Sequence, residues 1–172
     1  MSRIAGSETE VVIGDLRRRF VPLLSTVFAM LLGLLPIVTT TLWVPNLAFL
    51  MLITWRLVRP EVWQAQVALG LGLLADLIVP GAPLGQSMLL WTLIFLSLDY
   101  ADHLLGVRDY WLDWTLAAAA ILFHSAGVWY IALLMGAKLS IIIMIPQLIL
   151  SILAYPLMAR IVLGLDRWRL AR

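Results

Sequence analysis

Six apolar segments follow one another along the chain, separated by short polar or proline-containing turns. They cover roughly residues 20–41, 45–58, 64–79, 86–104, 113–135 and 139–163. About 20 helical residues cross a hydrocarbon layer of ~30 Å, and the longer segments reach this length. Only 13% of the residues are charged, whereas soluble domains carry about 25%. The pattern predicts an all-α integral membrane protein, folded as a six-helix transmembrane bundle.

The remaining residues define a simple domain organisation. Residues 1–19 are predicted as a polar cytoplasmic arm, residues 20–163 as a single transmembrane domain, and residues 164–172 as a basic cytoplasmic tail. The first apolar run is too long for a signal peptide and lacks an Ala-x-Ala cleavage site, so we expect a retained first helix.

Cysteine is absent, which excludes disulfides and thiolate metal sites.

The basic residues predict the orientation in the membrane. With six crossings, both termini lie on one side, and that side receives eleven of the twelve lysine and arginine residues, leaving only Lys138 on the other. The positive-inside rule therefore predicts cytoplasmic N- and C-termini. The segments 45–58 and 64–79 are short and return the chain to the same side. A re-entrant pair that does not fully cross the membrane consequently remains an alternative.

A single carboxylate, Asp76, lies within the third apolar segment. Gly72 precedes it by one helical turn on the same face, and the turn that follows ends in Pro83, Leu84 and Gly85. An acid in lipid surroundings needs a partner, a wet cavity or a proton. Three interpretations remain open: an anchor hydrogen-bonded to this turn or to a helix end, a partner-binding or conformational role, and a proton or cation relay.

Few other polar groups fall inside the apolar segments. His124 is expected to be neutral and hydrogen-bonded to a neighbouring helix, in preference to nucleophilic catalysis with Ser125. Gln147 and Ser151 share a face of the last helix, which forms either an interhelical hydrogen-bonding seam or the wall of a pocket. A metal site needs three or four ligands, and Asp76 with His124 supplies two. We therefore expect no metal, no cofactor and no enzymatic activity.

The charged residues near the predicted cytoplasmic surface suggest two further features. Asp99, Asp102 and Asp109 flank one loop, which is either simply solvated or a docking site for a basic cytoplasmic partner. Arg56 ends the second segment and is expected to extend its guanidinium to the interface. The basic residues punctuate the apolar segments and form no continuous stripe, so nucleic acid is not an expected partner.

Several local motifs now resemble a known family. A proline opens the second segment at Pro45, and an Arg-Pro-Glu turn with Pro60 and Glu61 follows it. Gly-Leu-Leu-Ala-Asp-Leu then occupies residues 72–77, and Ala-Pro-Leu-Gly occupies residues 82–85. In this order and spacing, the stretch 45–86 resembles MreD, the small membrane subunit of the bacterial rod-shape system.

The resemblance implies a non-enzymatic protein of the bacterial inner (plasma) membrane that belongs to the elongation complex, or elongasome. MreC is then the main partner, with MreB, RodZ, RodA and its transpeptidase partner as further candidates, and the role is to support lateral peptidoglycan synthesis and cell shape. The resemblance also implies a bundle similar to the substrate-binding subunits of energy-coupling-factor transporters, without transferring vitamin binding.

The alternative function is a small-molecule, vitamin-type binding subunit of a membrane transporter, in which Asp76 and the polar face of the last helix line a pocket. The candidates for structural or partner-binding roles are Asp76, Gly72, Pro83, Leu84, Gly85, Pro60, Glu61, His124, Gln147 and Ser151.

Overall fold

A computed structural model describes residues 8–34, 45–78, 83–106, 109–137 and 140–170, with only the backbone for residues 8–19 and 62. This part of the chain is all-helical, as predicted. The α-helices are α1 (Glu8–Leu32), α2 (Leu47–Val58), α3 (Ala65–Ile78), α4 (Gln86–Leu105), α5 (Tyr110–Leu134) and α6 (Ile145–Leu170). Two short 3-10 helices, η1 (Pro60–Val62) and η2 (Ile141–Met144), precede α3 and α6.

Helix α2 forms the centre of the bundle. Every residue from Ala48 to Leu57 is buried, and α1, α5 and α6 pack against the helix. A helix that is apolar on all sides must be surrounded by others, and this one is rich in leucine, isoleucine and aromatic residues. It begins where the Asn46 side chain accepts a hydrogen bond from the Phe49 backbone N–H at 3.0 Å, which is a typical helix N-cap.

The lengths of the helices establish three candidate membrane spans. Gln86–Leu105, Tyr110–Leu134 and Ile141–Leu170 are long and apolar enough to cross a bilayer. The apolar part of α1 (Phe20–Leu32), α2 and α3 are shorter, and at 1.5 Å per residue they extend only about 18–21 Å. The bundle of six α-helices is therefore confirmed for the described residues, whereas six full crossings remain a prediction.

Two predicted boundaries are wrong. α1 begins at Glu8, inside the segment predicted as a polar arm, and continues through Pro22 to Leu32. α6 continues to Leu170, through most of the predicted tail, because Asp166 and Arg169 make contacts that order its last turns. The predicted end of the first helix at residue 41 lies outside the described residues.

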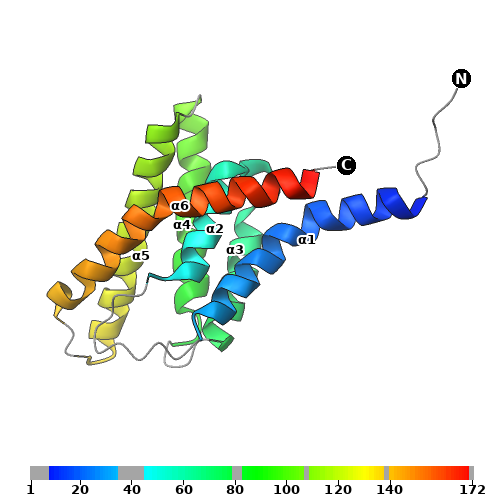
Figure 1. Ribbon diagram of the computed structural model, residues 1–172. Helices are drawn as coiled ribbons and strands as arrows, with labels where there is room; N and C mark the ends of the chain where they lie inside the picture. The colour runs from blue at the N-terminus through cyan, green and yellow to red at the C-terminus, as the bar shows by residue number, and fades with distance from the viewer. Residues whose placement is uncertain (1–7, 35–44, 79–82, 107–108, 138–139, 171–172) are drawn as a thin grey trace, which may run out of the picture.

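The two described ends of the chain lie on the same side of the bundle, where the first turns of α1 and the last turns of α6 project to the right in Figure 1. The N-terminal ends of α2, α4 and α6 lie toward the opposite end, in the lower part of that view. We call this opposite end the cavity end. The end that carries Arg56, Arg59 and Asp166 is called the charged end.

Candidate functional site

Asp76 caps the N-terminus of α4. Its side chain is 5% exposed and accepts hydrogen bonds from the backbone N–H groups of Gly85 at 3.0 Å, Ser87 at 2.9 Å and Met88 at 3.2 Å. The first N–H groups of a helix have no partner within the helix, and the helix dipole favours a negative charge there. The contacts confirm the interpretation of Asp76 as an anchor between its own helix and the following turn.

Gly72 makes this contact possible by bringing α3 close to α4. A Cβ atom at residue 72 would lie 2.6 Å from the Met88 Cα and 2.8 Å from the Ser87 carbonyl oxygen. Both distances are shorter than any normal contact, so only glycine fits. Because Gly72 and Asp76 lie one turn apart on the same face, one admits the start of α4 and the other binds it.

Four other candidate residues of the stretch 45–86 divide into two groups. Leu84 and Gly85 lie beside the Asp76 anchor, whereas Pro60 and Glu61 lie at the charged end. Gly85 adopts a φ of 94°, a left-handed conformation that favours glycine. The adjacent Leu84 is 71% exposed. Pro60 and Glu61 belong to η1 at the charged end and are exposed. The predicted partner-binding roles of these residues stay predictions.

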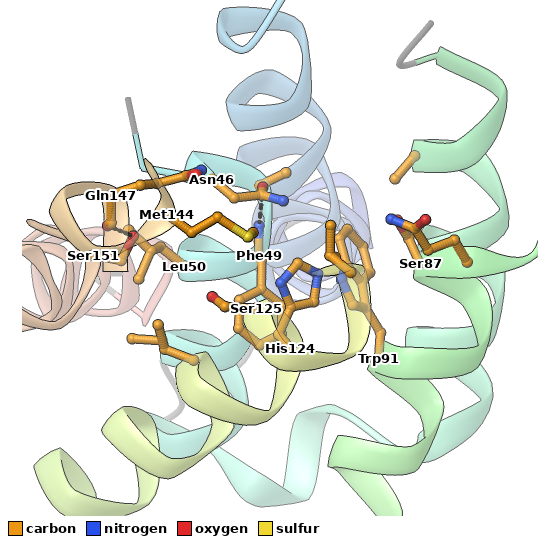
Figure 2. Close-up of a pocket in the computed structure, with 15 residues that line it drawn as sticks. Asn46, Phe49, Leu50, Ser87, Trp91, His124, Ser125, Met144, Gln147 and Ser151 are labelled. Atoms are coloured by element: carbon orange, nitrogen blue, oxygen red, sulfur yellow. Dashed lines mark hydrogen bonds between the residues drawn. The ribbon is translucent and has the colours of Figure 1, made fainter. Parts of the chain in front are cut away.

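A cavity of about 170 Å³ opens at the cavity end. Six polar side chains contribute to its wall: Asn46, Gln86, Ser87, Ser125, Gln147 and Ser151. Three aromatic rings, Phe49, Trp91 and His124, also line it. Figure 2 shows these rings at the centre, with Gln147 and Ser151 on one side and Ser87 on the other. The structure thus brings the predicted residues of α5 and α6 together around one cavity.

His124 is only 7% exposed, and its ring stacks on Phe49 with 4.2 Å between ring centroids and an interplanar angle of 14°. Its Nε2 atom has no hydrogen-bond partner in the described part of the chain. The expected hydrogen bond to a neighbouring helix is therefore wrong for these residues, because stacking replaces it. The Asp76 carboxylate is directed to α4, and no hydrogen bond or ion pair joins it to His124 among the described contacts.

The polar face of α6 forms a pocket wall. Ser151 donates its hydroxyl hydrogen to the Gln147 carbonyl oxygen of its own helix at 2.7 Å, and both residues line the cavity. The hydroxyl therefore bonds within α6 and does not form the interhelical seam that was one of the two sequence alternatives.

Arg56 lies inside the charged end, with a side chain that is 2% exposed. Its guanidinium donates to Asp99 Oδ1 and, at 2.7 Å, to Asp102 Oδ2, so it links α2 to α4. The expectation that Arg56 extends to the interface is wrong, because two carboxylates neutralise it within the bundle. Asp99 and Asp102 were predicted as docking residues, and each accepts this contact with one carboxylate oxygen. Asp109, the third predicted docking residue, is exposed just before α5.

A second ion-pair group at the charged end was missed by sequence reasoning. Asp166 accepts from Arg59 at 2.7 Å and from Arg169 at 2.6 Å. The Arg169 guanidinium also lies 5.4 Å from the centre of the Trp55 ring. The hydrogen bond from Arg59 to Asp166, followed by the charge of Asp166, holds the pKa of Arg59 above its ordinary value. The sequence did contain a signal for this contact. Arg59 follows α2 and Asp166 lies near the end of α6, and the predicted topology places these oppositely charged residues on the same side of the membrane.

A comparison with protein families shows which family the chain belongs to. The model of the rod shape-determining protein MreD matches residues 16–168. The chain belongs to the MreD family. The resemblance found in residues 45–86 is thereby confirmed, and it extends over nearly the whole chain. As a member of the MreD family, the protein is a membrane protein with a role in rod-shape determination.

No curated protein and no solved structure shows a significant match to the chain. The likeness of this MreD-family bundle to energy-coupling-factor transporter subunits is therefore not confirmed and stays a prediction.

Proposed function

We propose that this MreD-family protein is a non-enzymatic subunit of the elongation complex that binds MreC as its main partner. MreB, RodZ, RodA and its transpeptidase partner are the further components, and the assembly supports lateral peptidoglycan synthesis and cell shape. The observation that carries the proposal is the family match over residues 16–168. We do not propose the transporter-subunit alternative.

The turn before α4 is the surface that we propose for partner contact. Leu84 is 71% exposed, and its neighbour Gly85 is held by the Asp76 carboxylate. An apolar depression beside the turn is lined by Leu69, Leu89 and Ile131, among others. An exposed leucine on a well-anchored turn loses little conformational freedom on binding, so it is well suited to contact another membrane protein.

We propose the inner membrane as the location, with the charged end in the cytoplasm. The absence of cysteine permits a direct test with single-cysteine variants. Asp109→Cys at the charged end and Ser140→Cys before η2 both replace exposed residues. In intact spheroplasts, a membrane-impermeant thiol reagent should label Ser140→Cys only, and both variants after lysis. Labelling of Asp109→Cys before lysis would reverse the orientation.

Co-purification tests the partner. The tagged chain and MreC are expressed together and purified in a mild detergent, and MreC should be retained in a fixed ratio. Leu84→Glu should lower the recovered MreC at least fivefold. Leu104→Glu is the matched control, because Leu104 is 67% exposed at the charged end. Folded protein that consistently lacks MreC would contradict the proposed function, and equal recovery with both variants would contradict the proposed surface.

A further inference from the structure

An apolar groove runs along the outside of the bundle between α1 and α6. Its volume is about 880 Å³, and α2 contributes Leu47 and Met51 to its lining. The walls are formed by large side chains that are exposed or half-buried: Phe20, Leu24 and Phe28 from α1, and Ile161, Leu165 and Trp168 from α6. In a membrane-embedded bundle, such a groove is covered either by lipid chains or by another transmembrane helix.

The groove offers almost no polar groups. Apart from Ser25 and the indole of Trp168, every described side chain of the lining is apolar. The Ser25 hydroxyl is already used, because its oxygen accepts from the Trp55 indole N–H at 2.9 Å and its hydrogen is donated to the Pro22 carbonyl oxygen at 2.9 Å. A polar molecule would lose its hydrogen bonds to water here without replacement, whereas a hydrocarbon chain has none to lose.

The lining favours an acyl chain over a transmembrane helix. Helices in membranes approach one another through small residues. Two small residues line the groove, and neither is available: Ser25 is bonded to α2, and Ala29 is 3% exposed. The α1 wall from Phe20 to Leu32 is about 18 Å long at 1.5 Å per residue. This length is close to the about 15 Å that one leaflet contributes to a hydrocarbon layer of ~30 Å.

Positive charge lies at one end of the groove. Phe20 and Trp168 are the lining residues nearest the charged end, and tryptophan is enriched where a membrane meets water. Arg167 directly precedes Trp168 in α6, is exposed, and makes no hydrogen bond or ion pair within the described part of the chain. On α1, Arg17 lies one helical turn before Phe20 and Val21, at the same register position. Arginines at the membrane surface attract anionic lipid headgroups.

We propose that the groove between α1 and α6 binds one anionic phospholipid. An acyl chain lies along the groove, and the phosphate lies at the end marked by Arg17 and Arg167. In the proposed orientation this end faces the cytoplasmic leaflet, which is rich in anionic lipids. The site goes beyond the proposed function, because contact with MreC through the turn before α4 does not require it.

Native mass spectrometry of the purified full-length chain tests the lipid. Dioleoyl phosphatidylglycerol and dioleoyl phosphatidylcholine have the same acyl chains, and only the first carries a net negative charge. Each is added at the same concentration to the protein in a nonionic detergent. One phosphatidylglycerol molecule should be retained per chain, at least about fivefold more often than phosphatidylcholine. Equal retention of the two lipids, or retention of neither, would overturn the proposal.

A matched pair of variants locates the acyl chain. Leu24→Gln places an amide in the groove and should lower phosphatidylglycerol retention at least about fivefold. Leu153→Gln is the control, because Leu24 and Leu153 are both 64% exposed, whereas Leu153 is not part of the described groove lining. The same retention in both variants would exclude the groove as the lipid site.

The double variant Arg17→Gln/Arg167→Gln locates the headgroup. It should reduce the preference for phosphatidylglycerol over phosphatidylcholine to less than about twofold, while the retention of phosphatidylcholine stays unchanged. Because the preference is a ratio measured on one folded sample, it remains valid if the variant is less stable. An unchanged preference would overturn the proposal.

The outcome is separable from that of the proposed function. MreC recovery is measured on Leu24→Gln and Leu153→Gln as well. Normal MreC recovery from a chain without lipid preference would refute the lipid site and leave the proposed function intact, and the converse result would do the opposite. Loss of MreC in Leu24→Gln alone, with lipid retention unchanged, would also refute the lipid site and would assign the groove to a transmembrane helix of the partner.

Discussion

The carboxylate of Asp76 and the backbone N–H of Ser87 are joined by a 2.9 Å hydrogen bond across eleven positions of sequence. This bond uses Oδ1, whereas Gly85 and Met88 donate to Oδ2. Both oxygens are therefore occupied, and an asparagine keeps only one of them as an acceptor. The number of acceptor oxygens at residue 76 is thus one property that contributes to the attachment of α4 to α3, beside the close approach at Gly72.

The first prediction concerns this carboxylate. Asp76→Asn should lower the free energy of unfolding by about 1–3 kcal/mol, because it loses one acceptor and the charge. For a chain of this length, that corresponds to a melting temperature about 3–10 °C lower. Asp76→Ala should cost more. Asp109→Asn is the control, since its side chain makes no capping hydrogen bond. Identical melting of the wild type and of both Asp76 variants in one detergent would exclude the anchor.

The second prediction concerns helix approach. Gly72→Ala should destabilise the protein by about 1–3 kcal/mol, because its Cβ would overlap the Met88 backbone. Gly70→Ala, two residues earlier in the same helix, meets no atom within 4 Å. It should be neutral or stabilising by up to about 1 kcal/mol, through helix propensity alone. Thermal unfolding of the pair distinguishes close packing from propensity, and equal effects would contradict the packing seen here.

The third prediction concerns backbone conformation. Gly85→Ala should cost about 1–2 kcal/mol, because its φ of 94° is unfavourable for a residue with a Cβ atom. No neighbouring atom lies within 4 Å of that Cβ position, so the cost comes from the backbone and not from a clash. Gly164→Ala, with equally open surroundings in α6, should not destabilise. Chemical unfolding monitored by circular dichroism measures both.

The fourth prediction concerns the charged end. The double variant Asp99→Asn/Asp102→Asn leaves the Arg56 guanidinium buried without a counter-charge and should cost about 3–5 kcal/mol. Arg56→Met should cost less, because Asp99 is 41% and Asp102 is 24% exposed and water can solvate both. Melting temperatures and expression levels of the two variants decide the order. The reverse order would show that the ion pairs are not the main determinant.

Sequence reasoning located the helices well because apolar periodicity and proline positions are local properties. It found Asp76 and Gly72 for a similar reason: an acid and a glycine in an apolar segment are conspicuous, and one helical turn separates them. The anchor was one of three interpretations, and only the position of the α4 N-terminus distinguished it from the others.

The contacts between helices were not predictable in the same way. Arg56 appeared exposed because its burial depends on α4, whose carboxylates are 43 and 46 residues away in sequence. His124 stacks on Phe49 where a hydrogen bond to a neighbouring helix was expected. This stacking depends on the relative rotation of α2 and α5, so it was not predictable from either segment alone. The extension of α6 to Leu170 likewise depends on Arg59, a residue outside that helix.

The pairing of Arg56 with Asp99 also has a consequence during biosynthesis. Ribosomes add about 5–20 residues per second, so the 43-residue separation corresponds to an interval of about 2–9 s. Throughout this interval α2 has emerged without its counter-charge. We expect the guanidinium to remain hydrated outside the hydrocarbon layer until α4 arrives, because a buried charge without a counter-charge is costly. On this expectation, the central helix of the bundle reaches its final depth only after α4 has been synthesised.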